Sequence, residues 1–353
     1  MWSRTALAAV LFLCVPGARA DQFDFVALGD TAYRVPEDLP AYDALIDTIN
    51  AAKPAFSIHV GDIWGASPCT AAEYEKMHER FQKFSAPLVY TPGDNEWVDC
   101  RTPEVITAYV RFMRQEASPA DLALLGPLRT FDAAYTRAGY DDVLSRLADL
   151  RRVFFPRAES LGRKPLRLTR QSDVSEFEDV PENAKWTHRG VLFATVHVPG
   201  SQNDFFINDE KTAAEAIRRN RAAVAWLESA FVDAKAADAK AVVIAMHASL
   251  FFAGPGDEEF GHTLRGGGSG PFYWVARALR DLGSEFGRPV LLVHGDFHQF
   301  IVDKPFRVTT GEVTPARYDN ITRLQVYGAP DVRAVRVSVD TDTPWVFGFA
   351  PLY

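Results

Sequence analysis

The chain has 353 residues, of which 47% are hydrophobic and 24% charged, and its formal net charge is −8 at pH 7. This composition is typical of a globular protein and excludes disordered and collagen-like classes. An acidic chain has little electrostatic attraction to nucleic acid or to an anionic membrane surface, so we expect neither as a partner.

The first twenty residues predict a cleavable secretory signal peptide. Arg4 is followed by an apolar run over residues 6–15, and residues 18–20 read Ala-Arg-Ala, a small-x-small cleavage signal. A short membrane anchor is the alternative, but the apolar run is about half the length that a bilayer span requires. We therefore expect a mature chain of residues 21–353 that is periplasmic or secreted, without stable insertion in a membrane.

The expected mature chain keeps two cysteines, Cys69 and Cys100, because Cys14 leaves with the signal peptide. Two cysteines in an oxidising compartment predict one disulfide. The bridge would join the loop after Asp62 to the loop after Asp94. In the chain-entropy model it would contribute about 3 to 4 kcal/mol to the free energy of unfolding.

Apolar runs of strand length recur along the chain with helical patterns between them. The runs are FDFVALGD, AFSIHVGD, PLVYTPGD, VLFATVH, AVVIAMH and PVLLVHGDFH, and they end at Asp30, Asp62, Asp94, His197, His247 and His298. This alternation predicts an α/β sheet in which the loops at the carboxyl ends of the strands gather one site.

Four helices are predicted between these runs. Thr70 and Glu73 form a capping box ahead of one helix, and Pro103 is placed to open another. A third helix covers about residues 209–235, and a fourth follows Pro271. The residues expected on the apolar faces of the first three are Tyr74, Met77, Phe81 and Phe84; Val105, Tyr109 and Phe112; and Ile217, Val224, Leu227 and Phe231.

Three further segments complete the predicted fold. Residues 117–185 are interpreted as a mostly helical, charged insertion on the same domain, and the glycine-rich residues 254–271 as either a mobile loop beside the site or a plain connection. Near the end, LQVYGAP, VRAVRVSVD and WVFGFAPLY alternate like antiparallel strands. We therefore expect an α/β (α+β) fold, a four-layer αββα sandwich of two stacked mixed sheets flanked by helices.

Four of the strand patterns end in a Gly-Asp pair. The pairs are Gly29-Asp30, Gly61-Asp62, Gly93-Asp94 and Gly295-Asp296. A glycine there lets the chain adopt a positive φ or approach a ligand closely. Each pair alone could be an ordinary solvated turn, but four pairs with His247 and His298 indicate convergent oxygen and imidazole ligands. Uncompensated carboxylates raise one another's pKa, and this number of ligands suits two metal ions better than one.

These motifs resemble, in order and spacing, those of the calcineurin-like metallophosphoesterases, of which the purple acid phosphatases are a branch. The family pattern is Asp-x-His, Gly-Asp, Gly-Asn-His-Glu (or Asp), a strand-end His and Gly-His-x-His. The chain has Asp30-Thr31-Ala32, Gly61-Asp62, Gly93-Asp94-Asn95-Glu96, Met246-His247 and Gly295-Asp296-Phe297-His298. The resemblance covers most of the mature chain and indicates a divergent bacterial exported subgroup, with a Gly-Asp-Asn-Glu third motif, of the purple acid phosphatase-like branch.

The resemblance implies a dinuclear metal site. The first ion would be bound by Asp30, Asp62 and His298, and the second by the bridging Asp62 with Asp94, His247 and Asp296. Asp94 and Asp296 stand where the family has Asn and His, and the added charge favours iron, manganese, magnesium or calcium over zinc. Ala32 cannot bind a metal where the family often has His. Tyr33, one residue on, is a candidate phenolate ligand, with a packing tyrosine as the alternative.

The resemblance also implies an activity, the hydrolysis of a small phosphate mono- or diester by a hydroxide bound at the dinuclear site that Asp62 bridges. Where the family's third motif has a His that assists the leaving group, the chain has Asn95, which donates a hydrogen bond but transfers no proton at neutral pH. His262 in the glycine-rich segment is the first candidate for a compensating acid, and His197 the second.

Two other functions stay open at this stage. The chain could be a non-catalytic exported protein that keeps the fold and binds a metal or ligand, or it could perform a different metal-dependent hydrolysis. Among the remaining polar residues, His59 is interpreted as a core histidine and His294 as a residue that orients a ligand. Glu96 either supports the site or bonds its own turn, and residues 199–203 are expected to line the site.

Overall fold

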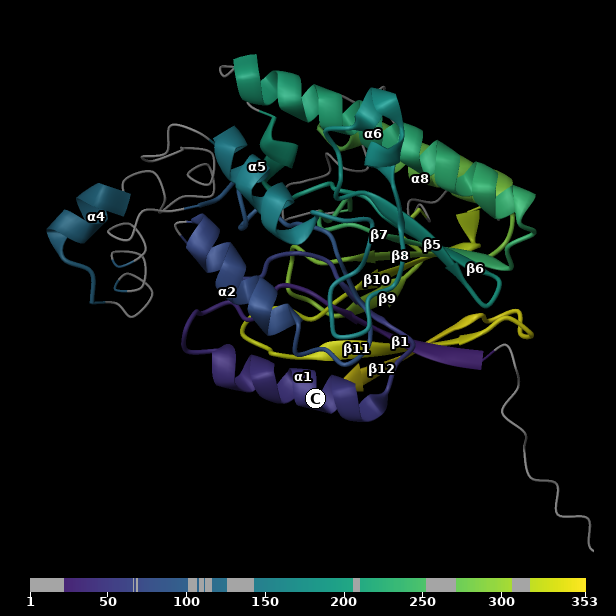
Figure 1. Cartoon of the computed structure of the whole chain (residues 1–353), viewed down its shortest axis with the longest axis horizontal. Helices are drawn as coiled ribbons and strands as arrows, with labels where there is room; N and C mark the ends of the chain where they lie inside the picture. Colours follow the sequence, from purple (N-terminus) through teal and green to yellow (C-terminus); the bar gives the residue numbers. More distant parts are fainter. Residues whose placement is uncertain are drawn as a thin grey trace, which may run out of the picture.

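The computed structural model describes residues 22–65, 67, 69–100, 107, 111, 116–125, 143–205, 210–251, 271–306 and 318–353. These residues form two mixed β-sheets stacked face to face, with helices on both outer sides (Figure 1). The predicted four-layer fold class is therefore confirmed.

The first sheet has five strands. In spatial order they are β12 (Phe347–Leu352), β11 (Ala334–Asp340), β1 (Gln22–Leu28), β2 (Ser57–His59) and β3 (Leu88–Tyr90). β1, β2 and β3 are parallel, whereas β11 pairs antiparallel with both β1 and β12. The carboxyl ends of the three parallel strands thus lie at the same edge.

The second sheet has seven strands. In spatial order they are β4 (Thr169–Arg170), β5 (Ala184–His188), β6 (Val191–Thr195), β7 (Ala241–Ala245), β8 (Val290–His294), β10 (Ile321–Gln325) and β9 (Ile301–Asp303). The four strands β6, β7, β8 and β10 are parallel, and the outer strands pair antiparallel. The pattern predicts an antiparallel β10. It pairs antiparallel with β9 but parallel with β8, so it also belongs to the parallel part of the sheet.

The helices flank the two sheets. They are α1 (Leu39–Ala52), α2 (Ala71–Phe81), α4 (Pro119–Leu125), α5 (Val143–Phe154), α6 (Glu210–Ala236) and α8 (Tyr273–Phe286), with 3-10 turns η3 (Gln171–Asp173), η4 (Ser175–Phe177) and η5 (Ser201–Asp204). In Figure 1, α1 lies on the outer side of the five-stranded sheet and α6 on that of the seven-stranded sheet. None of the described helices is long and apolar enough to span a membrane.

Buried apolar side chains form three layers, one between the sheets and one under the helices on each outer side. This arrangement explains why the sequences of the strands are continuous apolar runs. Successive residues of a strand point to opposite faces, so Phe25 packs between the sheets while Val26 packs against the helices of its own side. In β7, Val243 likewise lies between the sheets, and Ile244 packs toward α6 and α8. Both faces of each sheet are therefore covered, as parallel strands require.

The predictions for the segments between the strands are confirmed only in part. The capping box is present, since the carboxylate of Glu73 accepts the backbone N–H of Thr70 at 3.0 Å. On α6, Leu227 and Phe231 are buried as expected, but Ile217 is 45% exposed because the buried stripe at that end runs one position away, through Ala216. The helix expected after Pro103 and the glycine-rich segment 254–271 lie largely outside the described residues.

The described residues of 117–185 (117–125 and 143–185) are helical only in part. α4 and α5 lie in this range, and α5 packs against α2. The range also contains β4 and the first residues of β5, which form one edge of the seven-stranded sheet. The expectation of a mostly helical segment is therefore wrong for its second half.

Candidate metal centre

The predicted ligands lie in loops that follow parallel strands of both sheets. Asp30, Asp62 and Asp94 follow β1, β2 and β3, while His247 follows β7 and Asp296 follows β8. The loops are joined across the two sheets, since the N–H of Ala329, after β10, donates to the carbonyl oxygen of Asp30 at 3.2 Å. The loops at the carboxyl ends of parallel strands from both sheets therefore contribute to one site. Open α/β sheets usually bind ligands at this end of their strands.

Two groups of ligand atoms converge there and share one residue. Atoms of Asp30, Asp62 and His298 lie within 4.8 Å of one another, and so do atoms of Asp62, Asp94 and His247. We call these five residues the ligand cluster. Asp62 belongs to both groups, so the structure brings together five of the six residues that the resemblance assigns to two ions. The binding of metal by these residues stays a prediction.

Both histidines of the ligand cluster are oriented by backbone carbonyl groups. His247 Nδ1 lies 2.8 Å from the carbonyl oxygen of Val60, and His298 Nδ1 lies 2.9 Å from that of Ala329. A carbonyl oxygen only accepts, so each Nδ1 carries a hydrogen and each Nε2 faces the carboxylates. His247 Nε2 is 3.0 Å from Asp94 Oδ1, and His298 Nε2 is 3.5 Å from Asp30 Oδ1. A carbonyl partner on the far nitrogen is typical of metal-binding histidines.

The cluster lacks positive charge. Burial raises the pKa of Asp30 to about 7 and that of Asp296 to about 6, and it raises the pKa of Asp62 well above its usual range. Against the effect of burial, the charges of Asp62 and Asp94 raise the pKa of His247. Against burial too, His247 lowers the pKa of Asp94. Without another cation, protons have to supply the missing charge.

Unsatisfied polar atoms in the cluster fit a bound cation. Asp30 Oδ2, Asp94 Oδ1 and His247 Nε2 are buried and have no aligned hydrogen-bond partner among the described residues. Buried polar atoms of this kind are rare unless a water, an ion or a function accounts for them. The donor set of carboxylate oxygens and imidazole nitrogens is one that iron and manganese accept readily.

The backbone of the site is strained. Asp30, Asp62, Asp296 and His298 all have positive φ, between 51° and 81°. Non-glycine residues in this region cost about 1 to 3 kcal/mol each and cluster at functional sites. The sequence suggested that the glycines of the Gly-Asp pairs take this conformation. Gly61 does, with φ +97°, but in three of the pairs the aspartate takes it.

Close approach is the role of the glycine in the third pair. A Cβ atom on Gly93 would lie 2.1 Å from Asp62 Oδ1, far inside contact distance. Gly93 therefore leaves the space that the carboxylate shared by both ligand groups occupies.

Asp296 lies beside the ligand cluster rather than in it. Its Oδ2 accepts the backbone N–H of Ser249 at 2.8 Å, and its own N–H donates to Asp30 Oδ1 at 3.0 Å. A Cβ on Gly200 would lie 2.9 Å from Asp296 Oδ1 and 2.8 Å from Asp94 Oδ2, so both carboxylates border the space beside Gly200. Its assignment to the second ion stays a prediction.

Asn95 and Tyr33 adjoin the shared carboxylate. The Asn95 amide nitrogen lies 2.7 Å from Asp62 Oδ2 and 2.9 Å from the Tyr33 hydroxyl. The Tyr33 ring meets the His298 ring edge to face at 4.6 Å. Burial, followed by the charge of Asp62, raises the pKa of Tyr33 well above its usual value. The role of Tyr33 as a phenolate ligand stays a prediction.

Glu96 joins the loops that carry Asp62 and Asp94. Its Oε1 accepts the Tyr90 hydroxyl at 2.9 Å and the backbone N–H of Ile63 at 3.2 Å. Of the two expected roles, this geometry favours support of the site from outside. The disulfide between Cys69 and Cys100 joins the same two loops further along.

Ser201 is a site residue that the sequence placed only within a lining segment. Its hydroxyl lies 2.7 Å from Asp94 Oδ2 and also contacts Asp99. Ser201 begins four successive residues with positive φ, which end at Asp204. The buried Arg219 secures this turn by donating to the backbone oxygen of Asn203 at 2.9 Å. No local sequence pattern indicates such a turn.

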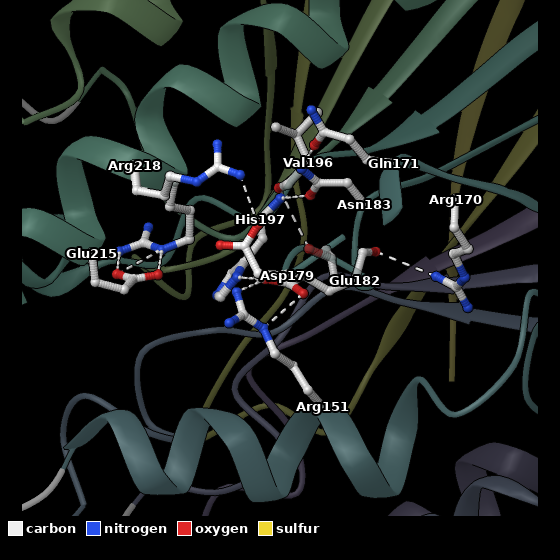
Figure 2. Close-up of polar contacts among 12 residues, drawn as sticks. Arg151, Arg170, Gln171, Asp179, Glu182, Asn183, Val196, His197, Glu215 and Arg218 are labelled. Atoms are coloured by element: carbon white, nitrogen blue, oxygen red, sulfur yellow. Dashed lines mark hydrogen bonds and ion pairs between the residues drawn. The ribbon is translucent and has the colours of Figure 1, made fainter. Parts of the chain in front are cut away.

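His197 lies in a buried polar network (Figure 2). Its Nδ1 is 2.7 Å from Glu182 Oε1, and Glu182 forms an ion pair with Arg151 at 2.7 Å. Both His197 and Glu182 are fully buried, and burial lowers the pKa of His197 although Glu182 opposes this. This placement speaks against His197 as a proton donor. His262, the first candidate acid, lies outside the described residues.

The histidines that end the parallel strands β2 and β8 are buried too. His59 Nδ1 accepts the N–H of Gly61 at 3.2 Å, and burial lowers its pKa to about 3, as expected of a neutral core histidine. His294 Nδ1 lies 2.9 Å from the carbonyl oxygen of Gly295, and burial lowers its pKa to about 3 as well.

No protein-family model and no curated protein sequence matches the chain. Among solved structures, the chain is similar to a dimetal phosphatase from Danio rerio, with a TM-score of 0.44 and 10% sequence identity, over 94% of this chain and 98% of that one. It is also similar to GAP50, the anchor in the inner membrane complex of Plasmodium, with a TM-score of 0.42 and 11% identity, over 94% of this chain and 88% of that one. At these values the function has to be inferred from the residues of the site.

Proposed function

We propose that the chain is an exported metal-dependent phosphoesterase that hydrolyses a small phosphate mono- or diester at a dinuclear site. The observation that carries the proposal is the position of Asp62 in both groups of ligand atoms. A carboxylate shared by two such groups is the arrangement that holds two ions side by side. When bound, the ions would supply Lewis acidity at the phosphoryl group and an activated water.

The residues of the chain prepare this site before any ion binds. The carbonyl groups of Val60 and Ala329 fix the two imidazoles so that each Nε2 faces the carboxylates. The backbone N–H of Asn95 also donates to Asp62 Oδ1 at 3.2 Å, so Asn95 bonds both oxygens of the shared carboxylate. The ligands are therefore preorganised, and little rearrangement opposes binding.

Export is part of the proposal. The amino-terminal signal pattern supports it, and the disulfide between Cys69 and Cys100 fits an oxidising compartment. The excess of carboxylates in the cluster supports iron, manganese, magnesium or calcium over zinc as the bound metal.

A non-catalytic metal- or ligand-binding protein is the second candidate. Asn95, which stands in place of the family's His, transfers no proton, and its amide is engaged with Asp62 and Tyr33. His197 is buried in the network with Glu182, which speaks against it as a replacement for the missing acid.

Metal content and turnover distinguish the two candidates. Elemental analysis of protein purified from the exported fraction should give two ions per chain, and the protein should hydrolyse an aryl phosphate or a bis-aryl phosphate. Asp62→Asn should lose both properties, whereas Asp47→Asn, at an exposed position on α1, should retain both. Unchanged activity of Asp62→Asn would sink the proposal. One ion or none, with no turnover of either ester, favours the non-catalytic candidate.

A further inference from the structure

The orientation of the Asn95 amide is determined by its neighbour. The Nδ2 atom lies 2.7 Å from Asp62 Oδ2, and once a cation replaces the proton of Asp62 its carboxylate only accepts hydrogen bonds. If the amide were flipped, two oxygens would face each other in a buried site. The NH2 group therefore points at Asp62, and its second hydrogen points at the Tyr33 oxygen, 2.9 Å away.

This orientation leaves the Tyr33 hydroxyl hydrogen free to be donated elsewhere. An amide NH2 group only donates, so the Tyr33 oxygen is the acceptor of the bond to Asn95. Within the described part of the chain, no recorded hydrogen bond uses the hydroxyl as a donor. Tyr33 is partly exposed, unlike Asn95.

The Tyr33 ring is held in place on several sides. A Cβ atom on Gly65 would lie 2.3 Å from the Tyr33 ring, so only glycine leaves room for the ring there. The N–H of Gly65 donates to the Tyr33 carbonyl oxygen at 2.7 Å, and the His298 ring packs against the tyrosine. A hydroxyl fixed in this way is a preorganised donor.

We propose that the Tyr33 hydroxyl donates a hydrogen bond to a phosphoryl oxygen of the substrate, with Asn95 as the positioning residue. This inference rests on the proposed function, because it takes the ligand to be a phosphate ester bound at the cluster. Asn95 connects the hydroxyl to the carboxylate of Asp62, so an anion drawn to ions at Asp62 comes close to the donor. Tyr33 then supplies a substrate contact beside the residue that replaces the family's His.

A role of Tyr33 as a metal ligand predicts a different effect of its replacement on the metal content. A phenolate ligand would direct its oxygen at the ion, and the loss of that oxygen would lower the metal content. A donor to the substrate leaves the metal content untouched. The two roles are therefore separated by measurements that need no turnover.

The test is the binding of inorganic phosphate to metal-loaded protein by titration calorimetry. Tyr33→Phe should weaken phosphate binding by about 10- to 100-fold, the effect of one hydrogen bond to a charged group. Its metal content should equal that of the wild type. Tyr42→Phe is the matched control, since the Tyr42 hydroxyl is buried in the core without a hydrogen-bond partner among the described residues, and it should bind phosphate normally.

A second variant probes the pair directly. In Asn95→Ala the amide that holds the Tyr33 oxygen is gone, so the hydroxyl is no longer positioned. Tyr33→Phe should therefore cause at most a twofold further loss in the Asn95→Ala background, against about 10-fold or more in the wild type. Equal losses in both backgrounds would overturn the inference, even if one single variant is poorly stable.

Each outcome bears on Tyr33 separately from the enzyme activity. Wild-type affinity for phosphate in Tyr33→Phe overturns the inference, and a lost ion or a lost tyrosinate-to-iron absorption band assigns Tyr33 to the metal instead. If the wild type binds phosphate through Tyr33 but turns over neither ester, the proposed activity fails while the contact stands. If the wild type binds no phosphate at all, both fail.

Discussion

His247 and Val60 lie in loops that follow strands of different sheets, and the imidazole Nδ1 of His247 donates to the carbonyl oxygen of Val60 at 2.8 Å. This bond leaves Nε2 directed at Asp62 and Asp94, at 3.3 Å and 3.0 Å. The histidine thereby links the seven-stranded sheet to the two acidic loops of the five-stranded sheet.

Replacing His247 should remove one ion. In His247→Ala the group formed by Asp62, Asp94 and His247 loses its nitrogen ligand, so we expect a loss of affinity at least as large as the 10- to 100-fold that outer-shell changes cause at metal sites. Elemental analysis after dialysis should give about one ion per chain. His78→Ala on α2, away from the cluster, should keep two. Two tightly held ions in His247→Ala would contradict the assignment.

The pH should govern the stability of the metal-free protein. Burial raises the pKa of Asp30 to about 7 and that of Asp296 to about 6, above the usual value of 3.8. These two carboxyl groups therefore bind more protons in the folded state between about pH 4 and pH 7, and their contribution to stability falls as the pH rises through this window. The buried His59 and His294, whose pKa is lowered to about 3, contribute in the opposite sense below about pH 6.5. Urea unfolding with a chelator should therefore show a less stable protein at pH 8 than at about pH 6.5.

Added metal should restore the stability that the metal-free protein loses at higher pH, because a bound ion supplies the positive charge that the protons on the carboxylates supplied at lower pH. The gain in the free energy of unfolding on adding metal should be larger at pH 8 than at pH 5. Asp30→Asn should flatten the pH dependence of the metal-free protein while weakening metal binding. A metal-free protein that is most stable at pH 8 would show that the carboxylates are not crowded in solution.

The loop-end aspartates were predictable, while the groups that orient them were not. Asp30, Asp62 and Asp94 could be found because a charged residue directly after an apolar run is a local break in pattern. The carbonyl group of Val60 and the N–H of Ser249 are backbone groups. Nearly every residue type has both groups, so residue identity does not predict which of them will orient a side chain.

The differences between expectation and structure have a similar origin. Ile217 is apolar at helical spacing, yet which stripe of α6 faces the sheet is decided by tertiary packing. His197 follows a strand as the predicted ligands do, but its Nδ1 lies 2.7 Å from Glu182, fifteen residues earlier in the chain. Sequence position alone does not separate a predicted ligand from a buried histidine here.

The buried network around Glu182 should matter for stability and not for metal binding. Glu182→Gln leaves Arg151, whose side chain is 19% exposed, without its ion pair, and removes the charged partner of His197. Breaking a buried pair on one side costs about 3 kcal/mol. Urea unfolding should show this loss, with the metal content unchanged. Glu285→Gln, which breaks an exposed pair with Lys235, is the control and should cost about 0.5 kcal/mol or less.

The disulfide between Cys69 and Cys100 should affect both stability and the metal site. It closes a separation of 31 residues that includes α2 and β3 and ends beyond Asp94. In the chain-entropy model, the double change Cys69→Ala and Cys100→Ala should lower the free energy of unfolding by about 3 to 4 kcal/mol. Because the bridge joins the loops that carry Asp62 and Asp94, its loss should also weaken metal binding. Reductant should reproduce both effects in the wild type and neither in the double variant. If the variant kept full metal affinity at normal stability, Glu96 and its bonds to Tyr90 and Ile63 would suffice to join the loops.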